Sequence, residues 1–523
     1  MTLTTWILIF FIIQIIHGLG TWKLYTAAGR KAWEAFIPVY NAVVLMKIIN
    51  RPWWWVILLF IPVVNQIMIP VTWVETIRSF GFNSRKDTLL VILTLGFYIY
   101  YINYAQTLTH IPDRSLRPRT SAGEWVSSIL FAVVAATVVH TYVMQPFTIP
   151  TSSLEKTLLV GDFLFVSKFH YGARVPKTAI TFPMVHDTIP VIRKKSYNSK
   201  IQYPYFRLPG FQKIKRNDIV VFSWPVDNYR NIGPPPSGYA YKPIDKKSNY
   251  VKRCVGIPGD SLEVRNGFVF INGKQNELPD RAKLQFAHTI RTSSNVSQST
   301  FKRLDITDGV YPMGAGKPYY APAVTLDAAE ALRTSPGIAE VKRFTSEKGQ
   351  WESTIFPQDD RYPWNNDHFG PIYIPKKGAT VAITQETLPL YKRIIEVYEG
   401  SELGLEREIS LSGNQVLLNG QPLTEYTFEM DYYWMMGDNR NNSQDARSWG
   451  FVPFNHVVGK PVFVWASIDG INQGIGNWSM RWDRFFTTVG GDGKPVSYFR
   501  YFLILLAGWF VFDFFRKRRK KNA

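Results

Sequence analysis

The stretch that decides the fold reads Tyr250-Val251-Lys252-Arg253-Cys254-Val255-Gly256-Ile257-Pro258-Gly259-Asp260. Its first half is typical of a strand, and the Pro-Gly-Asp that follows is typical of a turn. Because successive side chains of a strand point to opposite faces, we expect Lys252 to enter a pocket while Arg253 meets solvent, or the reverse. Taken alone, the stretch is better explained as an exposed basic strand end, since lysine is mostly exposed.

Further strand and hairpin signals surround this stretch. Ile219-Val220-Val221-Phe222 is a short β-branched run, and 262–264 and 268–271 flank Asn266-Gly267, a strong hairpin signal. Asn419-Gly420 marks a similar turn after an apolar run. We therefore predict a mainly β domain over residues 147–495. Within it, residues 276–430 lack alternation for long stretches and are expected to form a loop-rich insertion.

The apolar residues, 46% of the 523-residue chain, gather near its ends. Uncharged runs that can each cross a bilayer lie at 1–22, between Arg51 and Glu75, between Asp87 and His110, and at 125–150. The first has no basic start and no Ala-x-Ala site, so it indicates a membrane span rather than a cleaved signal peptide. These runs predict a multi-span region at 1–122 with about three spans, a transmembrane helix at 123–146, and a C-terminal transmembrane helix with a basic tail at 496–523.

Lysine and arginine predict the orientation of the spans. The basic tail 516–521 and the arginines at 114, 117 and 119 should be cytoplasmic, which places the β domain on the outer side of the membrane. The loop that carries Arg78, Arg85 and Lys86 then falls outside, against the rule.

The formal net charge of +20 raises the question of nucleic-acid binding. No helix-turn-helix, RNP or zinc-knuckle pattern accompanies the charge, so we expect no nucleic-acid partner. Basic residues beside membrane spans favour anionic lipid headgroups instead. Cys254 is the single cysteine, so the chain can form no intramolecular disulfide.

Two polar clusters could carry chemistry together with Lys252. The first, Thr151-Ser152-Ser153, follows the predicted span that ends near residue 150, and by itself it could simply cap a helix or turn. The second runs from Gly437 to Pro453 and is dense in polar groups between large apolar residues. Polar groups in such surroundings must satisfy one another, which indicates either a hydrogen-bonded site or a well-knit structural loop.

Taken in their order along the chain, the clusters around Ser153, around Lys252 and from Gly437 to Pro453 resemble the conserved boxes of bacterial type I signal peptidases. The match is close at Gly161-Asp162, at Lys252 through Asp260, and at Gly437 through Pro453. The resemblance implies a membrane-anchored, signal-peptidase-like β fold. It also implies a serine endopeptidase that removes signal peptides from secretory preproteins after small-x-small sites such as Ala-x-Ala.

The resemblance assigns roles to individual residues. It makes Ser153 the nucleophile and Lys252 its general base, with an oxyanion hole formed by the Ser153 backbone N–H and the Thr151 hydroxyl. Ser443 is then the serine that hydrogen-bonds the lysine amine, and Asp445 and Arg447 form a supporting ion pair. Physically, a lysine can act as a base near neutral pH only if burial lowers its pKa.

Some positions depart from the usual family pattern. Leu154 stands for a methionine, Lys156 for a proline, Ser152 for a glycine and Asn441 for an aspartate. Lys156 is the largest change, since it removes a rigid turn and adds a charge next to the site.

The resemblance further implies secretory preproteins, membrane lipids and the secretion translocon as partners, and a location in the bacterial cytoplasmic membrane. We expect no cofactor and no metal, because no His, Cys or Asp cluster has ligand spacing. Two alternatives are a catalytically silent binding or assembly factor of the same fold and a self-cleaving Ser–Lys repressor. The intact Ser153, Lys252 and Ser443 argue against the former, and the four upstream spans against the latter.

Overall fold

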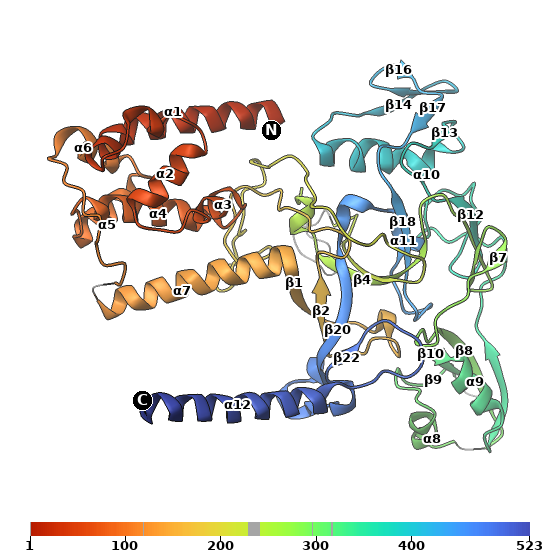
Figure 1. Cartoon of the computed structure of the whole chain (residues 1–523). Helices are drawn as coiled ribbons and strands as arrows, with labels where there is room; N and C mark the ends of the chain where they lie inside the picture. Colours follow the sequence, from red (N-terminus) through yellow and green to blue (C-terminus); the bar gives the residue numbers. More distant parts are fainter. Residues whose placement is uncertain (1, 119, 228–240, 295, 315–316, 523) are drawn as a thin grey trace. The chain divides into compact units, whose positions relative to one another are not determined.

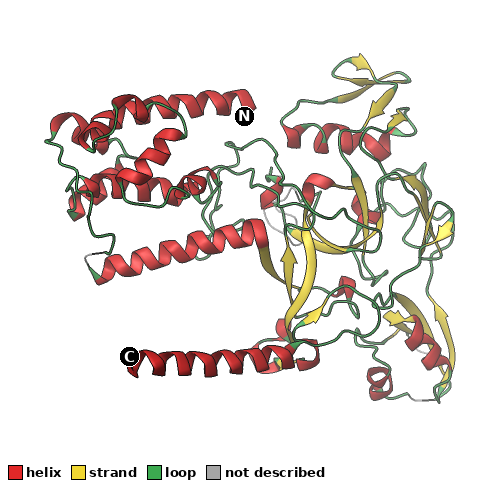
Figure 2. Cartoon of the chain, in the orientation of Figure 1, coloured by secondary structure: helices red, strands yellow, loops and turns green. Residues whose placement is uncertain are grey.

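The computed structural model of the chain describes residues 2–118, 120–227, 241–294, 296–314 and 317–522 (Figure 1). Two compact units emerge. The first comprises Met1–Val143, Val175–Arg207 and Tyr229–Lys246, and the second comprises Met144–Arg174, Leu208–Asn228 and Lys247–Ala523. Figure 2 shows that helices dominate the chain up to residue 143, whereas nearly all strands follow.

The first unit is largely helical. Its helices are α1 (Leu3–Ala27), α2 (Tyr40–Ile48), α3 (Trp55–Phe60), α4 (Asn65–Ser79), α5 (Arg85–Leu93), α6 (Tyr98–Ala105) and α7 (Ser121–Val138). Leu24, Val44 and Ile102 are among the side chains of its buried core. The carboxylate of Glu75 forms ion pairs with Arg51 and Arg114, which joins three separate segments of the unit.

Among the described residues, two helices are long and apolar enough to cross a membrane, Leu3–Ala27 and Ser121–Val143. The pair α5 and α6 would make a third span, but it is bent by 118°. The uncharged run between Arg51 and Glu75, expected as one span, is instead divided between α3 and α4. Pro62 follows α3 and cannot supply the backbone N–H that a continuing helix needs, which explains the break.

The second unit is built on a large antiparallel sheet, which confirms the predicted mainly β fold, although Val175–Arg207 and Tyr229–Lys246 belong to the first unit. Its strand order is β1-β2-β20-β3-β4-β18-β19, and β21 and β22 also pair with β20. These strands are β1 (Met144–Thr148), β2 (Asp162–Ser167), β3 (Ile219–Ser223), β4 (Asn249–Gly256), β18 (Tyr432–Met436), β19 (Val452–Pro453), β20 (Val457–Asp469), β21 (Ser479–Met480) and β22 (Thr487–Thr488).

Three smaller sheets belong to the same unit. Their strands are β5 (Ser261–Arg265), β6 (Phe268–Ile271), β7 (Lys274–Gln275) and β12 (Phe369–Tyr373) in one sheet, β13 (Thr380–Ala382) and β17 (Glu425–Thr427) in another, and β14 (Ile409–Ser412), β15 (Gln415–Leu418) and β16 (Gln421–Pro422) in the last. Short helices α10 (Leu388–Arg393) and α11 (Ala446–Trp449) and the C-terminal α12 (Phe499–Asn522) complete it. The hairpins predicted at Asn266-Gly267 and Asn419-Gly420 are both confirmed.

A fourth small sheet, with the order β11-β8-β10-β9, belongs to a segment that we call the 285–343 module. Its elements are β8 (Gln285–Thr292), α8 (Gln298–Arg303), β9 (Tyr311–Pro312), β10 (Tyr319–Thr325), α9 (Leu326–Arg333) and β11 (Ile338–Arg343). Ile290, Phe301 and Leu332 lie in a hydrophobic cluster of the module's own. The interval 276–430, expected to be loop-rich, therefore contains folded sheets and helices.

Candidate functional site

Ser153 lies in the connection between β1 and β2, which we call the serine turn (residues 149–161). Backbone bonds between Ile149 and Asp162 and between Gly161 and Ile149, both 2.9 Å, close the neck of this connection. Leu154 and Leu158 anchor the turn in the core. Ser153 itself occupies a one-turn 3-10 helix, Ser152–Leu154, and is 8% exposed. The packed leucines thus fix the position of a nearly buried hydroxyl.

Lys252 lies in the middle of β4, between two hydrogen-bonded neighbours. It faces Val220 of β3 in the register, and β18 pairs with β4 on the other side. Its amine is 2.5 Å from the Ser153 hydroxyl oxygen, and the two groups are joined by a hydrogen bond. Although β1 and β4 are separated in the strand order by three other strands, the two predicted residues are brought together.

The surroundings of the Lys252 amine favour its neutral form. The residue is 3% exposed, which disfavours the charged form, whereas the Tyr250 ring, whose centre lies 5.6 Å from the amine, is a weak attraction for the cation. Burial lowers the pKa of Lys252 from its usual 10.5 to about 8, an effect that the carboxylates of Asp445 and Asp438 oppose and the Arg447 guanidinium reinforces. At neutral pH roughly a tenth of such an amine is uncharged and able to accept a proton.

Arg253 does not meet solvent, so the expectation of one buried and one exposed side chain is wrong. Arg253 is 2% exposed, and its guanidinium donates to both carboxylate oxygens of Asp438, at 2.8 and 2.7 Å. The other carboxylate contact of Asp438 is the Thr157 hydroxyl of the serine turn, at 2.7 Å. A bidentate buried pair therefore connects β4 to the serine turn on the strand face opposite Lys252.

The polar loop (residues 437–448) follows β18 and packs directly on the serine turn. The backbone N–H of Asn439 donates to the Ser153 carbonyl at 3.1 Å, and the Asn439 side chain donates to the Ser152 carbonyl at 3.2 Å. A Cβ atom added at Gly437 would lie 2.5 Å from the Ser153 carbonyl oxygen and 2.2 Å from the Ser443 hydroxyl. Only glycine allows this close approach.

Ser443 and Thr151 make fewer contacts than their predicted roles involve. The Ser443 hydroxyl is buried next to Gly437, but among the described residues it has no hydrogen-bond partner, so the predicted bond to the Lys252 amine is not formed. Thr151 is exposed at the start of the 3-10 turn, and its side chain makes no capping bond there.

Asp445 and Arg447 form the predicted ion pair, which is buried. The guanidinium contacts both carboxylate oxygens at 2.9 and 2.8 Å, and it also donates to the Arg440 carbonyl at 2.6 Å. Asp445 in turn accepts the backbone N–H of Gly437 at 3.1 Å. Burial opposes ionisation of Asp445, but Arg447 outweighs it and holds the pKa of that carboxyl below its usual value. The pair thus shapes the loop that contacts the serine turn.

Removing this pair should destabilise the domain. In Asp445→Asn, Arg447 stays buried without its counter-charge, so we expect the free energy of unfolding to fall by about 3 kcal/mol. Chemical denaturation of the detergent-solubilised chain, followed by tryptophan fluorescence, measures the change. The matched control is Asp469→Asn, because Asp469 is ion-paired with Arg481 but 64% exposed. The control should change stability by less than about 1 kcal/mol; equal effects of the two substitutions would contradict the role of burial.

Sequence reasoning missed two features of the site, the Arg253–Asp438 pair and the contacts of Asn439. Both residues of the pair lie inside the matched boxes with opposite charges, which is the signal that could have identified it. No group of three His, Cys, Asp or Glu side chains suited to hold a metal ion occurs within the residues the structure describes.

Two known protein families match the chain, one over the residues that contain the site and one over the N-terminal helices. Residues 122–314 and 374–466, more than half of the chain, match the family described as "Signal peptidase, peptidase S26". Residues 33–112 match a family of unknown function, DUF5684.

Three relatives named signal peptidase I show the extent of the similarity. The protein of Helicobacter pylori (strain ATCC 700392 / 26695) is 24% identical over 381 residues, which cover 71% of this chain and 93% of the relative. That of Haemophilus influenzae is 25% identical and covers 73% and 80%. That of Buchnera aphidicola subsp. Acyrthosiphon pisum is 26% identical and covers 64% and 72%.

Proposed function

Because the chain belongs to the signal peptidase family S26, we propose that it removes signal peptides from secretory preproteins with a serine–lysine dyad, cutting after small-x-small sequences. The observation that carries the proposal is the 2.5 Å contact between the Ser153 hydroxyl and the Lys252 amine. A serine hydroxyl is a weak nucleophile and needs a base within this reach. Burial of the amine supplies the second requirement, a base that is partly neutral near pH 7.

The proposed reaction proceeds in two steps. Lys252 takes the proton of Ser153 while the hydroxyl oxygen attacks the scissile carbonyl, and the backbone N–H of Ser153 and the Thr151 hydroxyl stabilise the oxyanion. The protonated Lys252 then gives its proton to the leaving amine, which releases the mature protein. A water molecule activated by the neutral Lys252 finally hydrolyses the acyl-serine ester. Ser443, Asp445 and Arg447 support the geometry of the site.

The proposed location is the bacterial cytoplasmic membrane, with several spans. The helices Leu3–Ala27 and Ser121–Val143 are the strongest candidates, and α12 would bring the basic tail to the cytoplasmic surface. In this topology the β domain lies on the outer side, where secretory preproteins emerge. Anionic lipids and the secretion translocon are the proposed contacts of the membrane region.

Cleavage of a defined preprotein tests the function. The full chain in detergent or liposomes should cut a preprotein with an Ala-x-Ala site directly after the second alanine, as mass spectrometry of the products would show. The matched control substrate has phenylalanine as the residue before the cut, and its cleavage should be lost because the large ring overpacks a small pocket. Absence of cleavage, or equal cleavage of both substrates, would contradict the proposal. A metal chelator should leave the rate unchanged.

A further inference from the structure

Lys156 stands three residues after Ser153 in an unusual backbone conformation. Its φ angle is +69°, in the left-handed region that side-chain-bearing residues rarely adopt. Bacterial type I signal peptidases usually have a proline at this position, and the proline ring fixes the backbone φ angle. In this chain some other constraint must hold the serine turn in shape.

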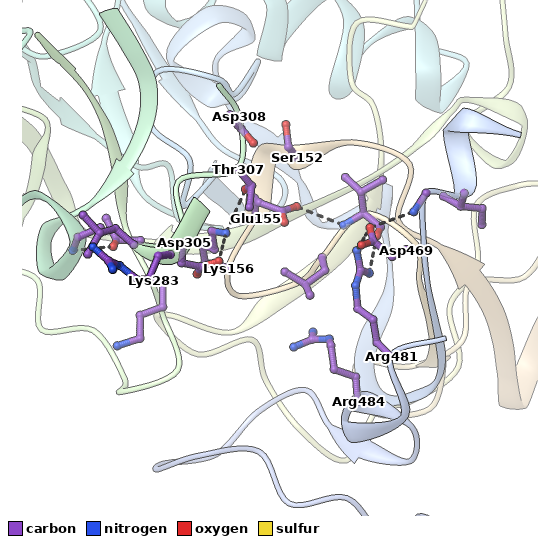
Figure 3. Close-up of a pocket in the computed structure, with 18 of the residues that line it drawn as sticks. Ser152, Glu155, Lys156, Lys283, Asp305, Thr307, Asp308, Asp469, Arg481 and Arg484 are labelled. Carbon is purple, nitrogen blue, oxygen red and sulfur yellow. Dashed lines mark hydrogen bonds and ion pairs between the residues drawn. The ribbon is translucent and has the colours of Figure 1, made fainter. Parts of the chain in front are cut away.

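The constraint comes from the loop that connects α8 to β9 in the 285–343 module. The Lys156 amine donates to the Asp305 carboxylate at 2.8 Å and to the Thr307 hydroxyl at 3.1 Å (Figure 3). The Lys156 side chain is only 8% exposed, whereas that of Asp305 is 73% exposed. A nearly buried ammonium whose charge is satisfied by one carboxylate loses much when that carboxylate is removed.

The same loop reaches the serine turn by a second route. Asp308 accepts a hydrogen bond from the Asn439 side chain at 3.4 Å, and that side chain also donates to the Ser152 carbonyl. The backbone N–H of Lys283, just before β8, donates to the Thr157 hydroxyl at 3.2 Å. The serine turn is thus held before Ser153 by Asn439, which Asp308 contacts, and after Ser153 by Asp305 and Thr307 of the module and by the backbone of the preceding Lys283.

The serine turn, the module and residues between 469 and 484 also line a partly open cavity of about 950 Å³. Lys156 and Asp305 both line this cavity and meet there, as Figure 3 shows. The contact therefore joins two chain segments that are far apart in sequence at the edge of this cavity.

We propose that Lys156 is a positioning residue: bound by Asp305 and Thr307, it holds the serine turn so that the Ser153 hydroxyl stays within reach of Lys252. The 285–343 module then acts as a brace for the nucleophile, in place of a rigid turn residue. This inference rests on the proposed function, since it assigns a part in the same reaction.

The test compares four variants of the full chain in detergent with the preprotein described above. Lys156→Met and Asp305→Asn should each lower kcat by about tenfold with KM changed less than about twofold, because a misplaced nucleophile slows the chemical step without weakening substrate binding. The double variant should be no slower than the worse single variant, since both substitutions break one contact. Lys156→Arg, which keeps a donor for Asp305 and Thr307, should recover most of kcat.

The matched control is Asp327→Asn. Asp327 lines the same cavity and pairs with Lys283 at 3.6 Å, but its side chain is 86% exposed and it does not contact the serine turn. Its kcat and KM should equal those of the unchanged chain. Because the Asp305 side chain is largely exposed, Asp305→Asn should fold even if Lys156→Met does not. In that case the kcat of Asp305→Asn compared with that of Asp327→Asn tests the inference by itself.

Three results would overturn the inference. If kcat is unchanged in Asp305→Asn, or if the loss in the double variant equals the product of the two single losses, the contact does not position Ser153. The proposed function is unaffected by either result. If the variants lower the melting temperature without a specific loss of kcat, and Lys156→Arg performs no better than Lys156→Met, the contact only stabilises the fold. If the unchanged chain itself does not cleave the preprotein, the proposed function fails first.

Discussion

Ser153→Ala is expected to abolish preprotein cleavage, with a loss in kcat of about 10⁴-fold or more. The substitution removes the oxygen that would form the acyl intermediate, so Lys252 has neither a nucleophile to deprotonate nor an ester to hydrolyse. The only hydrogen bond of the side chain in the described structure joins it to Lys252, so the fold should persist. Cleavage assays by gel and mass spectrometry, with circular dichroism for folding, measure both effects.

The adjacent serine supplies the control for this prediction. Ser152 carries the same hydroxyl one residue earlier, but its oxygen accepts from Asn442 at 2.9 Å rather than contacting Lys252. Ser152→Ala should therefore retain most of the activity. If Ser152→Ala were inactive and Ser153→Ala active, the nucleophile would have been assigned to the wrong residue.

Lys252→Met should cause a loss of similar size, about 10⁴-fold in kcat. Methionine keeps an unbranched apolar chain in the buried site but offers no group that accepts a proton. Lys252→Arg should be equally inactive, because a guanidinium stays protonated at any working pH. This second substitution separates the loss of a base from the loss of a positive charge.

A lysine outside the site is the control here. Lys274 lies on β7 and is exposed, so Lys274→Met should cleave at the normal rate. Activity retained in Lys252→Arg would contradict the proton-acceptor role, since it would mean that the site needs only a cation.

The sequence predicted features that depend on local pattern. The strand 219–222 and the two Asn-Gly hairpins follow from residues close together in the chain, and each is confirmed. The Asp445–Arg447 ion pair, which the resemblance implied, is also formed. Ser153 and Lys252 were chosen through the resemblance, and the roles assigned to them remain predictions. Their 2.5 Å contact, however, could not be derived from spacing, because a curled sheet brings β4 to the serine turn.

Features that depend on tertiary contacts were missed. Arg253 was expected in solvent because it points to the strand face opposite Lys252, but its partner Asp438 stands 185 residues later in the chain. The 285–343 module lacks clear alternation because its strands are irregular, with register shifts where β8 pairs with β10 and with β11. No periodic pattern can reveal that a loop of this module contacts Lys156.

The central claim is that Lys252 is a partly neutral amine at working pH, and its titration tests this directly. NMR of the chain labelled at the lysine side chains, with Lys252→Met to assign the signal, should give a pKa of about 8 for Lys252. Since the neutral amine is the reactive form, kcat/KM should fall tenfold per pH unit below that pKa and level off above it. An amine in the active protein that stays protonated up to its usual value of about 10.4, with kcat/KM already level at pH 7, would contradict the account.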